Sequence, residues 1–322
     1  MLLIIIVLLF IALYRSTTCS FIVISICNLL VWYRVGKECQ IPEINSTHEE
    51  TDHRQILYLF YAKDKGYKYS VVRSPGSDSF FLLLYYAHRL KPLIVFLDIG
   101  SGEHRKLLNI TDIANDFGEE YCCTLLGYYI FTGKDTTSAF RGKGKVNPLK
   151  KVLKKPRFHS TFQALGKDWQ VPGNIYEELE EFVCLMYGYE RYKKVNQVRS
   201  LMLKNGWGDN DKIKKKANID LSKLPPCLNT FRPHTDRVNY KTGIGKTSHI
   251  ARPNIPSPEH NGWMYDDGGL IQTHWSYGAI LPDRLIDIVE GIQSTSSDEE
   301  ETDDGCSLSD QFITDSEDED SD

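Results

Sequence analysis

The sequence predicts an α/β fold in which a partly parallel sheet is flanked by helices. From Ile44 onward, segments with helical periodicity alternate with short apolar segments of strand length. The run Leu93–Ile99 (LIVFLDI) is apolar almost throughout, which is typical of a strand covered on both faces. With 322 residues, the chain can form one large domain or two small ones.

The most apolar part of the chain is residues 2–33, which carry Arg15 near their centre. As a single membrane span this segment is long enough, although Arg15 would cost about 2.5–3.5 kcal/mol on insertion. Arg34 and Lys37 follow it, so a transmembrane anchor would leave the body cytosolic. A cleaved signal peptide and a segment foreign to the following domain are the alternatives. Without an anchor, we expect a nuclear protein.

The first globular region is expected to alternate helices and strands. Thr111 is a suitable N-cap for the last helix of this region. The predicted elements are a helix over Thr51–Asp64, a strand over Tyr69–Arg73, a helix over Ser79–Leu90, a strand over Leu93–Ile99, an edge strand over Lys106–Ile110 and a helix over Thr111–Phe117.

The second half is expected to be helical and then irregular. Tyr176–Tyr187 and Val195–Lys204 have amphipathic patterns, whereas prolines accumulate from Leu224 to Pro258 and favour an irregular wrap. A last helix is expected over Pro282–Gly291. The predicted units are an apolar segment (1–36), an α/β domain (47–190), a helical or irregular extension (191–292) and a disordered acidic tail (293–322).

Charge is distributed unevenly along the chain. Residues 298–322 hold 13 acidic and no basic side chains, which leaves 30 acidic against 38 basic residues elsewhere, a net charge of about +8. A basic body favours a polyanionic partner. The 8 cysteines form no CxxC pair and have no zinc-ligand spacing, so we expect reduced thiols.

Residues 125–155 combine three features of a phosphate-handling site. An apolar run ends at Gly133-Lys134-Asp135, Gly142 and Gly144 alternate with lysines, and a lysine-rich amphipathic segment follows. These features suit a site that holds metal at one end and phosphate at the other. The alternative is a helix–turn–helix corner with a solvated cationic face.

Carboxylates also occur at the ends of predicted strands and at helix starts. They are Glu49, Glu50, Asp52, Asp78 and Asp98. Each has a structural explanation alone, as a helix-dipole, capping or turn residue. Together, they lie where α/β sheets bind their ligands, and metal-dependent phosphoryl transfer needs several converging carboxylates.

Four segments together resemble the flap-endonuclease/XPG-type branch of PIN-like nucleases, and more closely a set of mobile-element-derived animal proteins that carry such a domain. The segments are HEETDHR (48–54), VVRSPGSDSFFLLL (71–84), LLNITDIANDFG (107–118) and LLGYYIFTGKDTTSAFRGKGK (125–145). Residues 224–263 resemble the C-terminal part of the same set. The resemblance extends over roughly residues 47–288, and GKDTTSAFRGKGK is its most specific piece.

The resemblance implies a PIN-like fold with a helix–two-turn–helix element and a two-metal phosphodiesterase that uses Mg²⁺ or Mn²⁺. Glu50, Asp52, Asp78 and Asp135 would be the metal ligands, with Asp78 and Asp135 also catalytic. The implied substrate is branched or flap duplex DNA, and no small-molecule cofactor is expected. The implied nucleic-acid-binding residues are Arg141, Gly142, Lys143, Gly144, Lys145, Lys150, Lys151, Lys154 and Lys155.

The chain departs from the family pattern at three places. Gly76 replaces the first aspartate of a DxD pair, and Lys134 brings a cation next to Asp135. The first strand of the nuclease fold has no counterpart, so the sheet is expected to lack its N-terminal strand and to expose an apolar edge. We therefore expect a degenerate, structure-selective endonuclease-like protein that binds DNA through Gly142–Lys145. A non-catalytic nucleic-acid-binding remnant, or a membrane-anchored protein of another role, is the alternative.

Overall fold

The computed structural model describes residues 21–24, 42–207 and 221–278 of the chain. The rest of the apolar segment lies outside the described residues. The same holds for the predicted helix over Pro282–Gly291 and for the acidic tail.

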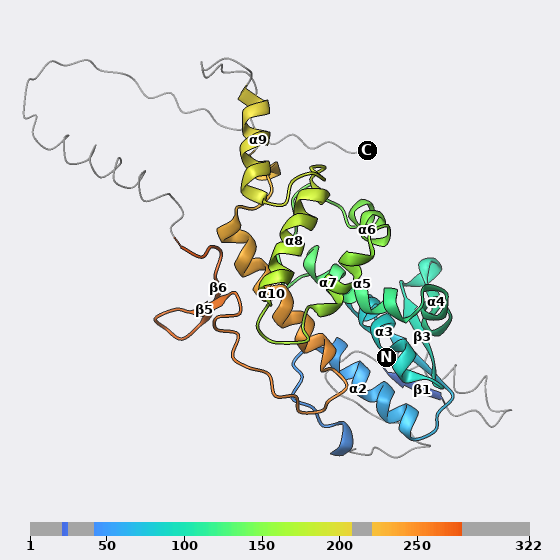
Figure 1. The fold of residues 1–322 in the computed structure, drawn as a ribbon. Helices are drawn as coiled ribbons and strands as arrows, with labels where there is room; N and C mark the ends of the chain where they lie inside the picture. Colours follow the sequence, from blue (N-terminus) through green and yellow to red (C-terminus); the bar gives the residue numbers. More distant parts are fainter. Residues whose placement is uncertain (1–20, 25–41, 208–220, 279–322) are drawn as a thin grey trace, which may run out of the picture. The chain divides into compact units, whose positions relative to one another are not determined.

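A small mixed sheet forms the first layer of the fold, and helices flank it (Figure 1). Its strands are β1 (Phe21–Ile24), β2 (Tyr69–Arg73), β3 (Ile94–Ile99) and β4 (Lys106–Asn109), in that spatial order. The first three strands are parallel, and β4 pairs antiparallel with β3. The α/β class is therefore confirmed.

Strand β1 corrects the prediction that the sheet lacks its N-terminal strand. Phe21–Ile24 pairs with β2 in parallel register from Phe21 opposite Tyr69 to Ile24 opposite Val72. The predicted bare edge of β2 is thus covered, because part of the apolar segment supplies the missing strand.

The transmembrane helix predicted over residues 2–33 is wrong. Within the described ranges, no helix has both the length and the apolar character needed to cross a membrane. Four residues from the middle of the predicted span, Phe21–Ile24, form a sheet strand instead.

Strands β2 and β3 bury alternate side chains. Val72, Val95 and Leu97 are fully or almost fully buried, whereas Val71 and Phe96 are only partly covered. One face of these strands is therefore fully packed, and the opposite face is partly covered, with Asp98 buried on it. The buried face belongs to the same apolar core as α3 (Ser77–Leu90).

The three helices predicted around the sheet are present, and each begins within two residues of the predicted position. The N-cap of α4 is Asn109, whose side chain accepts a hydrogen bond from Asp112 N. Thr111, the predicted cap, instead accepts a hydrogen bond from Val95 N and so ties the helix to β3. The helices are α2 (Thr51–Asp64), α3 (Ser77–Leu90), α4 (Ile110–Phe117) and α5 (Glu119–Phe131).

The remaining helices surround an aromatic core. Phe131 of α5 contacts Phe162 of α7, Phe182 of α8 and Phe231 of α10, with ring centroids 5.7, 6.0 and 6.4 Å away. All four rings are fully buried. The helices are α6 (Val146–Leu153), α7 (Pro156–Ala164), α8 (Gly173–Met186), α9 (Val195–Trp207) and α10 (Leu228–Lys246).

Helix α10 corrects the predicted irregular wrap, because 19 of those residues form one helix. Pro233 lies inside it and has no N–H to donate to the carbonyl of Asn229. Tyr277 N donates to that carbonyl at 2.9 Å instead. The later segment, with the hairpin strands β5 (Trp263–Tyr265) and β6 (Ile271–Thr273), thus replaces the bond that proline removes.

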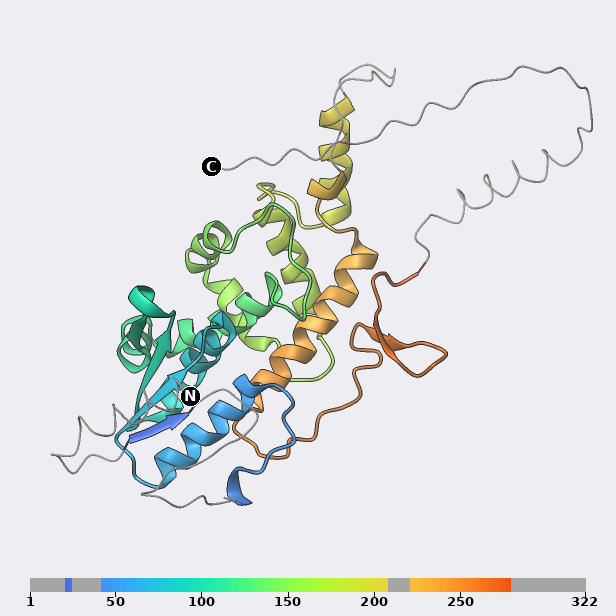
Figure 2. The same cartoon turned by 180° about the vertical axis from the view of Figure 1, so that it is seen from behind.

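Three short 3₁₀ helices complete the described chain: η1 (Pro42–Ile44), η2 (Gly102–His104) and η3 (Leu221–Lys223). The carboxyl-terminal part of α10 lies beside the start of α2 in both views (Figure 1 and Figure 2), where Lys241 pairs with Glu50. This contact joins the helical extension to the sheet.

The close contact of α5 with α7 gives a stability prediction. A Cβ atom at Gly127 would lie 2.3 Å from the carbonyl oxygen of Phe162. Gly127→Ala should therefore lower the free energy of unfolding by about 1–3 kcal/mol, although alanine is normally the better helix former. Urea unfolding measures this change. Gly173→Ala in α8 is the control, because a Cβ atom at Gly173 would have no neighbouring atom within 4 Å. This variant should not be destabilised. Equal stability of both variants would contradict the close packing.

The buried histidine of α10 gives a pH prediction. His234 donates Nε2–H to the carbonyl of Phe131 at 3.0 Å, and burial lowers its pKa to about 4. The unfolded chain binds a proton at this histidine below about pH 6.5, while the folded chain does not until about pH 4. Stability should therefore fall as pH falls through this window, by up to about 1.4 kcal/mol per pH unit for this group.

Unfolding free energies measured between pH 7 and pH 4.5 test this expectation. His234→Gln should be less stable at pH 7 but should have a smaller slope with pH than the original protein. The exposed His104 provides a surface control, because His104→Gln should change the stability at pH 7 by less than about 0.5 kcal/mol. An unchanged slope in His234→Gln would show that this imidazole is not kept neutral by the fold.

Candidate functional site

Three of the predicted metal ligands meet at the starts of two helices. Glu50 is the N-cap of α2, Asp52 lies in its first turn, and Asp78 lies in the first turn of α3. Helix α3 begins just after the carboxyl end of β2, and Ser79 in its first turn donates to Asp52 of α2, so both helices begin at that edge of the sheet. The sequence-based expectation that these carboxylates converge agrees with this placement.

The centre of this carboxylate cluster is an ammonium group. Lys134 Nζ lies 2.9 Å from Asp78 Oδ2 and 3.3 Å from Glu50 Oε2, and its side chain is only 7% exposed. Burial alone would lower the pKa of Lys134, but the charges of Glu50 and Asp78 raise it above its usual value. Lys134 is therefore a permanent cation within the cluster.

Glu50 is held ionised by neighbouring cations. Its Oε1 pairs with Lys241 Nζ at 3.1 Å, and its Oε2 lies 3.7 Å from His53 Nε2. Burial alone would raise the pKa of Glu50, yet His53, Lys134 and Lys241 lower it to about 2. Burial also lowers the pKa of His53 to about 4. Near neutral pH, the two lysines are therefore the cations that keep Glu50 ionised.

Asp52 has a different environment from Glu50. Its Oδ1 accepts a hydrogen bond from Ser79 Oγ at 2.5 Å, and Ser79 Oγ in turn lies 2.7 Å from Ser74 Oγ. Burial, together with the nearby charges of Asp78 and Glu50, raises the pKa of Asp52. The fold thus disfavours the charge of Asp52 relative to that of a solvent-exposed aspartate.

Asp78 is bound on both oxygens. Oδ2 pairs with Lys134, and Oδ1 accepts a short hydrogen bond from the hydroxyl of Tyr129, which also lies 2.6 Å from Ser77 Oγ. Burial and the bond to Asp78 raise the pKa of Tyr129, so the phenol stays protonated and donates.

Asp135 and Gly76 occupy less central positions. Asp135 is exposed, while Lys134 is the residue of this pair whose side chain reaches the cluster. Gly76 is the N-cap of α3 and lines a pocket of about 330 Å³ with Phe80 and Leu97. A Cβ atom there would have no contact closer than 3.8 Å, so the fold leaves room for the side chain that Gly76 lacks.

The residues present do not fit a divalent metal ion. Among residues 21–24, 42–207 and 221–278, no group of three or more His, Cys, Asp or Glu side chains is arranged to hold a metal. Carboxylate oxygens of Glu50 and Asp78 that could serve as ligands already contact Lys134. A divalent ion at that position would meet a positive charge.

Two features of the site were not predicted. Asp98 was interpreted as a turn residue, but it is buried in β3 and pairs with Arg73 and Arg105. It therefore stabilises the sheet edge and takes no part in the carboxylate cluster. Lys241 was also missed, because its segment was expected to be irregular, so no helix was available to place it beside Glu50.

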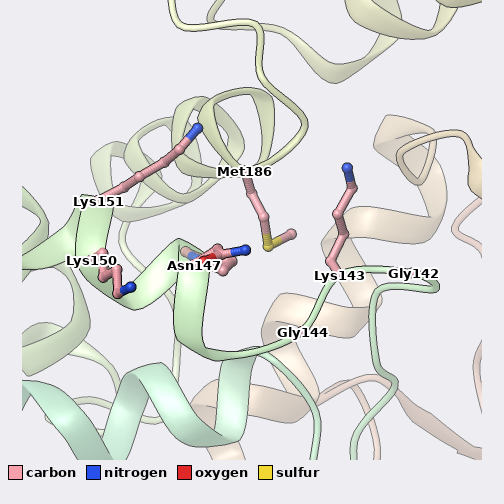
Figure 3. A pocket seen from close by; sticks show the side chains of 8 residues that line it. Gly142, Lys143, Gly144, Asn147, Lys150, Lys151 and Met186 are labelled. Atoms are coloured by element: carbon pink, nitrogen blue, oxygen red, sulfur yellow. The ribbon is translucent and has the colours of Figure 1, made fainter.

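The predicted DNA-binding segment Gly142–Lys145 borders an open pocket of about 530 Å³, here called the basic pocket (Figure 3). Lys143 lies on one side, Lys150 and Lys151 of α6 on the other, and Met186 of α8 between them. Its lining residues are Gly142, Lys143, Gly144, Asn147, Pro148, Lys150, Lys151 and Met186.

The backbone of the basic pocket is accessible at its two glycines. No atom lies within 4 Å of a Cβ placed on Gly142 or Gly144, and Gly142 has φ +69°. Lys143 Nζ lies 4.3 Å from the ring centroid of Tyr187. Partial burial, followed by the charge of Lys151, lowers the pKa of Lys143.

Other members of the predicted nucleic-acid set have intramolecular partners. Lys145 turns inward and donates to Tyr129 O at 3.2 Å, Thr132 Oγ1 at 3.1 Å and the carbonyl of Gly133. It therefore caps the carboxyl end of α5. Lys155 pairs with Glu190 at 3.5 Å, and Lys151 donates to Leu185 O at 2.9 Å. The exposed charged members are Arg141, Lys150 and Lys154.

Comparisons of the chain with protein-family models, with curated proteins and with solved structures found no match. The resemblance to PIN-like nucleases thus stays a prediction from the sequence. Conclusions about function depend on the geometry of the carboxylate cluster and the basic pocket.

The inward orientation of Lys145 gives a third prediction. Lys145→Met should lower the free energy of unfolding by about 1–3 kcal/mol, because it removes the donor to the acceptors at the end of α5. Lys150→Met, at an exposed position of the neighbouring helix, should change stability by less than about 0.5 kcal/mol. Urea unfolding compares the two variants. Equal losses would contradict the capping role of Lys145.

Proposed function

We propose that the protein binds nucleic acid through the phosphate backbone at the basic pocket, as a PIN-like domain that does not cleave. The observation that carries this proposal is the arrangement of Lys143, Lys150 and Lys151 around a pocket whose glycine backbone is open. The proposed partner is duplex DNA, including branched or flap forms.

The chemistry of the basic pocket suits phosphate groups. Ammonium groups neutralise phosphates, and glycines allow a phosphate to approach backbone N–H groups without a side chain in the way. Partial burial, followed by the charge of Lys151, lowers the pKa of Lys143, and a bound phosphate would favour the charged form of Lys143 again. The excess of 38 basic over 30 acidic residues before position 298 favours the same class of partner.

Support for a binding rather than a cleaving protein comes from the carboxylate cluster. Glu50, Asp52 and Asp78 lie at the carboxyl edge of the parallel strands, which is consistent with descent from a metal-dependent nuclease. Lys134 occupies the centre of that cluster. Phosphate binding at the basic pocket does not require the cluster to be reactive.

Salt-dependent binding tests this function. For the full chain and a fluorescently labelled DNA duplex, the logarithm of the affinity should fall linearly with the logarithm of salt between about 50 and 200 mM. Lys143→Ala/Lys150→Ala should reduce the magnitude of that slope by about 1.8, because two phosphate contacts are lost. Fluorescence anisotropy measures both quantities. Lys106→Ala, at an exposed lysine of β4, should change neither.

Two outcomes would contradict the proposal. Affinity that does not change with salt, or that falls equally in Lys106→Ala, would exclude the basic pocket as a phosphate site. Cleavage of flap DNA in Mg²⁺ or Mn²⁺ that disappears in Asp135→Ala would instead support the endonuclease implied by the sequence resemblance.

A further inference from the structure

The turn that carries Lys134 is rigid. Lys134 N donates to Thr137 Oγ1 at 3.0 Å, Thr137 N donates to Lys134 O at 3.0 Å, and Thr137 Oγ1 donates to Ile130 O at 2.8 Å. Gly133 precedes it with φ +112°, and a Cβ atom there would lie 2.7 Å from Ala139 Cβ. The backbone of this turn thus sets the direction in which the lysine side chain leaves it, independently of the ion pairs that the side chain forms.

The side chain ends where two carboxylates meet. Its Nζ atom contacts Asp78 Oδ2 at 2.9 Å and Glu50 Oε2 at 3.3 Å. These carboxylates come from different helices, so the ammonium group bridges α2 and α3. With 7% of its side chain exposed, Lys134 is more enclosed than a typical surface lysine.

The other oxygens of the two carboxylates are also occupied. Glu50 Oε1 pairs with Lys241 Nζ at 3.1 Å, and Asp78 Oδ1 accepts the hydroxyl hydrogen of Tyr129. Glu50 and Asp78 are therefore each paired with at least one ammonium group. A divalent ion requires several carboxylate oxygens that are free to approach one point. Here, groups of the chain itself already bind these oxygens.

We infer that the ammonium group of Lys134 is a built-in replacement for a divalent metal ion. It neutralises Glu50 and Asp78, holds α2 against α3 and keeps divalent cations out of the carboxylate cluster. Removal of this side chain should convert the cluster into a binding site for a hard divalent cation. This inference does not depend on binding at the basic pocket.

The test compares Mn²⁺ binding to the full chain and to Lys134→Ala. Loss of the Mn²⁺ electron paramagnetic resonance signal reports bound metal, and thermal unfolding with EDTA or with Mn²⁺ reports its effect on stability. The original protein should bind no Mn²⁺ at the cluster and should have the same Tm in both conditions. Lys134→Ala should have a lower Tm in EDTA, and saturating Mn²⁺ should raise that Tm by about 3 °C or more.

Lys241→Ala and Lys134→Arg are the matched controls. Lys241→Ala also removes a cation from Glu50 but leaves Lys134 in place, so it should not bind Mn²⁺. Lys134→Arg keeps the charge and should likewise exclude the ion. Lys134→Ala/Asp78→Asn should lose the Mn²⁺ site, because one of its carboxylates is gone.

The same double variant covers the case in which Lys134→Ala does not fold. If the cost arises from unneutralised carboxylates, removing the charge of Asp78 should restore folding, as circular dichroism would show. A double variant that stays unfolded would overturn the inference. So would Mn²⁺ binding by the original protein that Asp78→Asn abolishes, or a folded Lys134→Ala that binds no more Mn²⁺ than Lys241→Ala.

Discussion

The ion pairs of Lys134 and Glu50 connect segments that are distant in the chain. Glu50 begins α2, Lys134 follows α5, and Lys241 belongs to α10, so one carboxylate receives cations from the sheet-flanking helices and from the extension. Removing one member of such a partly buried network leaves a charge without its partner, which costs more than the pair itself contributes. The position of the carboxylate cluster and the docking of α10 therefore depend on the same charges.

The fold could be predicted where local patterns decide it. The bounds of α2 and β2 agree with the predicted Thr51–Asp64 and Tyr69–Arg73, because their periodicity and flanking residues are sufficient. Strand β1 could not be predicted, because a four-residue strand inside a long apolar segment has the composition of a membrane anchor. Helix α10 was missed because a proline signals a break, and the donor that compensates for it lies in a distant segment.

Part of the candidate site could be predicted from the order of strands and helices. Carboxylates at helix starts after parallel strands share one edge of the sheet, so the convergence of Glu50, Asp52 and Asp78 follows from topology. The direction of a lysine side chain does not follow from topology. Lys134 and Lys145 belong to one glycine-rich basic stretch, yet one enters the carboxylate cluster and the other caps α5. Their roles depend on how the turn after α5 folds back, which composition alone does not specify.

The proline in α10 determines where the last described segment of the chain attaches to this helix. In a regular helix, the carbonyl of Asn229 would be used by the residue four positions later and would offer nothing to the rest of the chain. Pro233 leaves this single acceptor available at one point along 19 residues, and Tyr277 uses it. Arg237, one turn further, binds the carbonyls of Gly262 and His274. The interruption in the helix therefore provides one specific attachment point along α10 for a segment that has little regular structure.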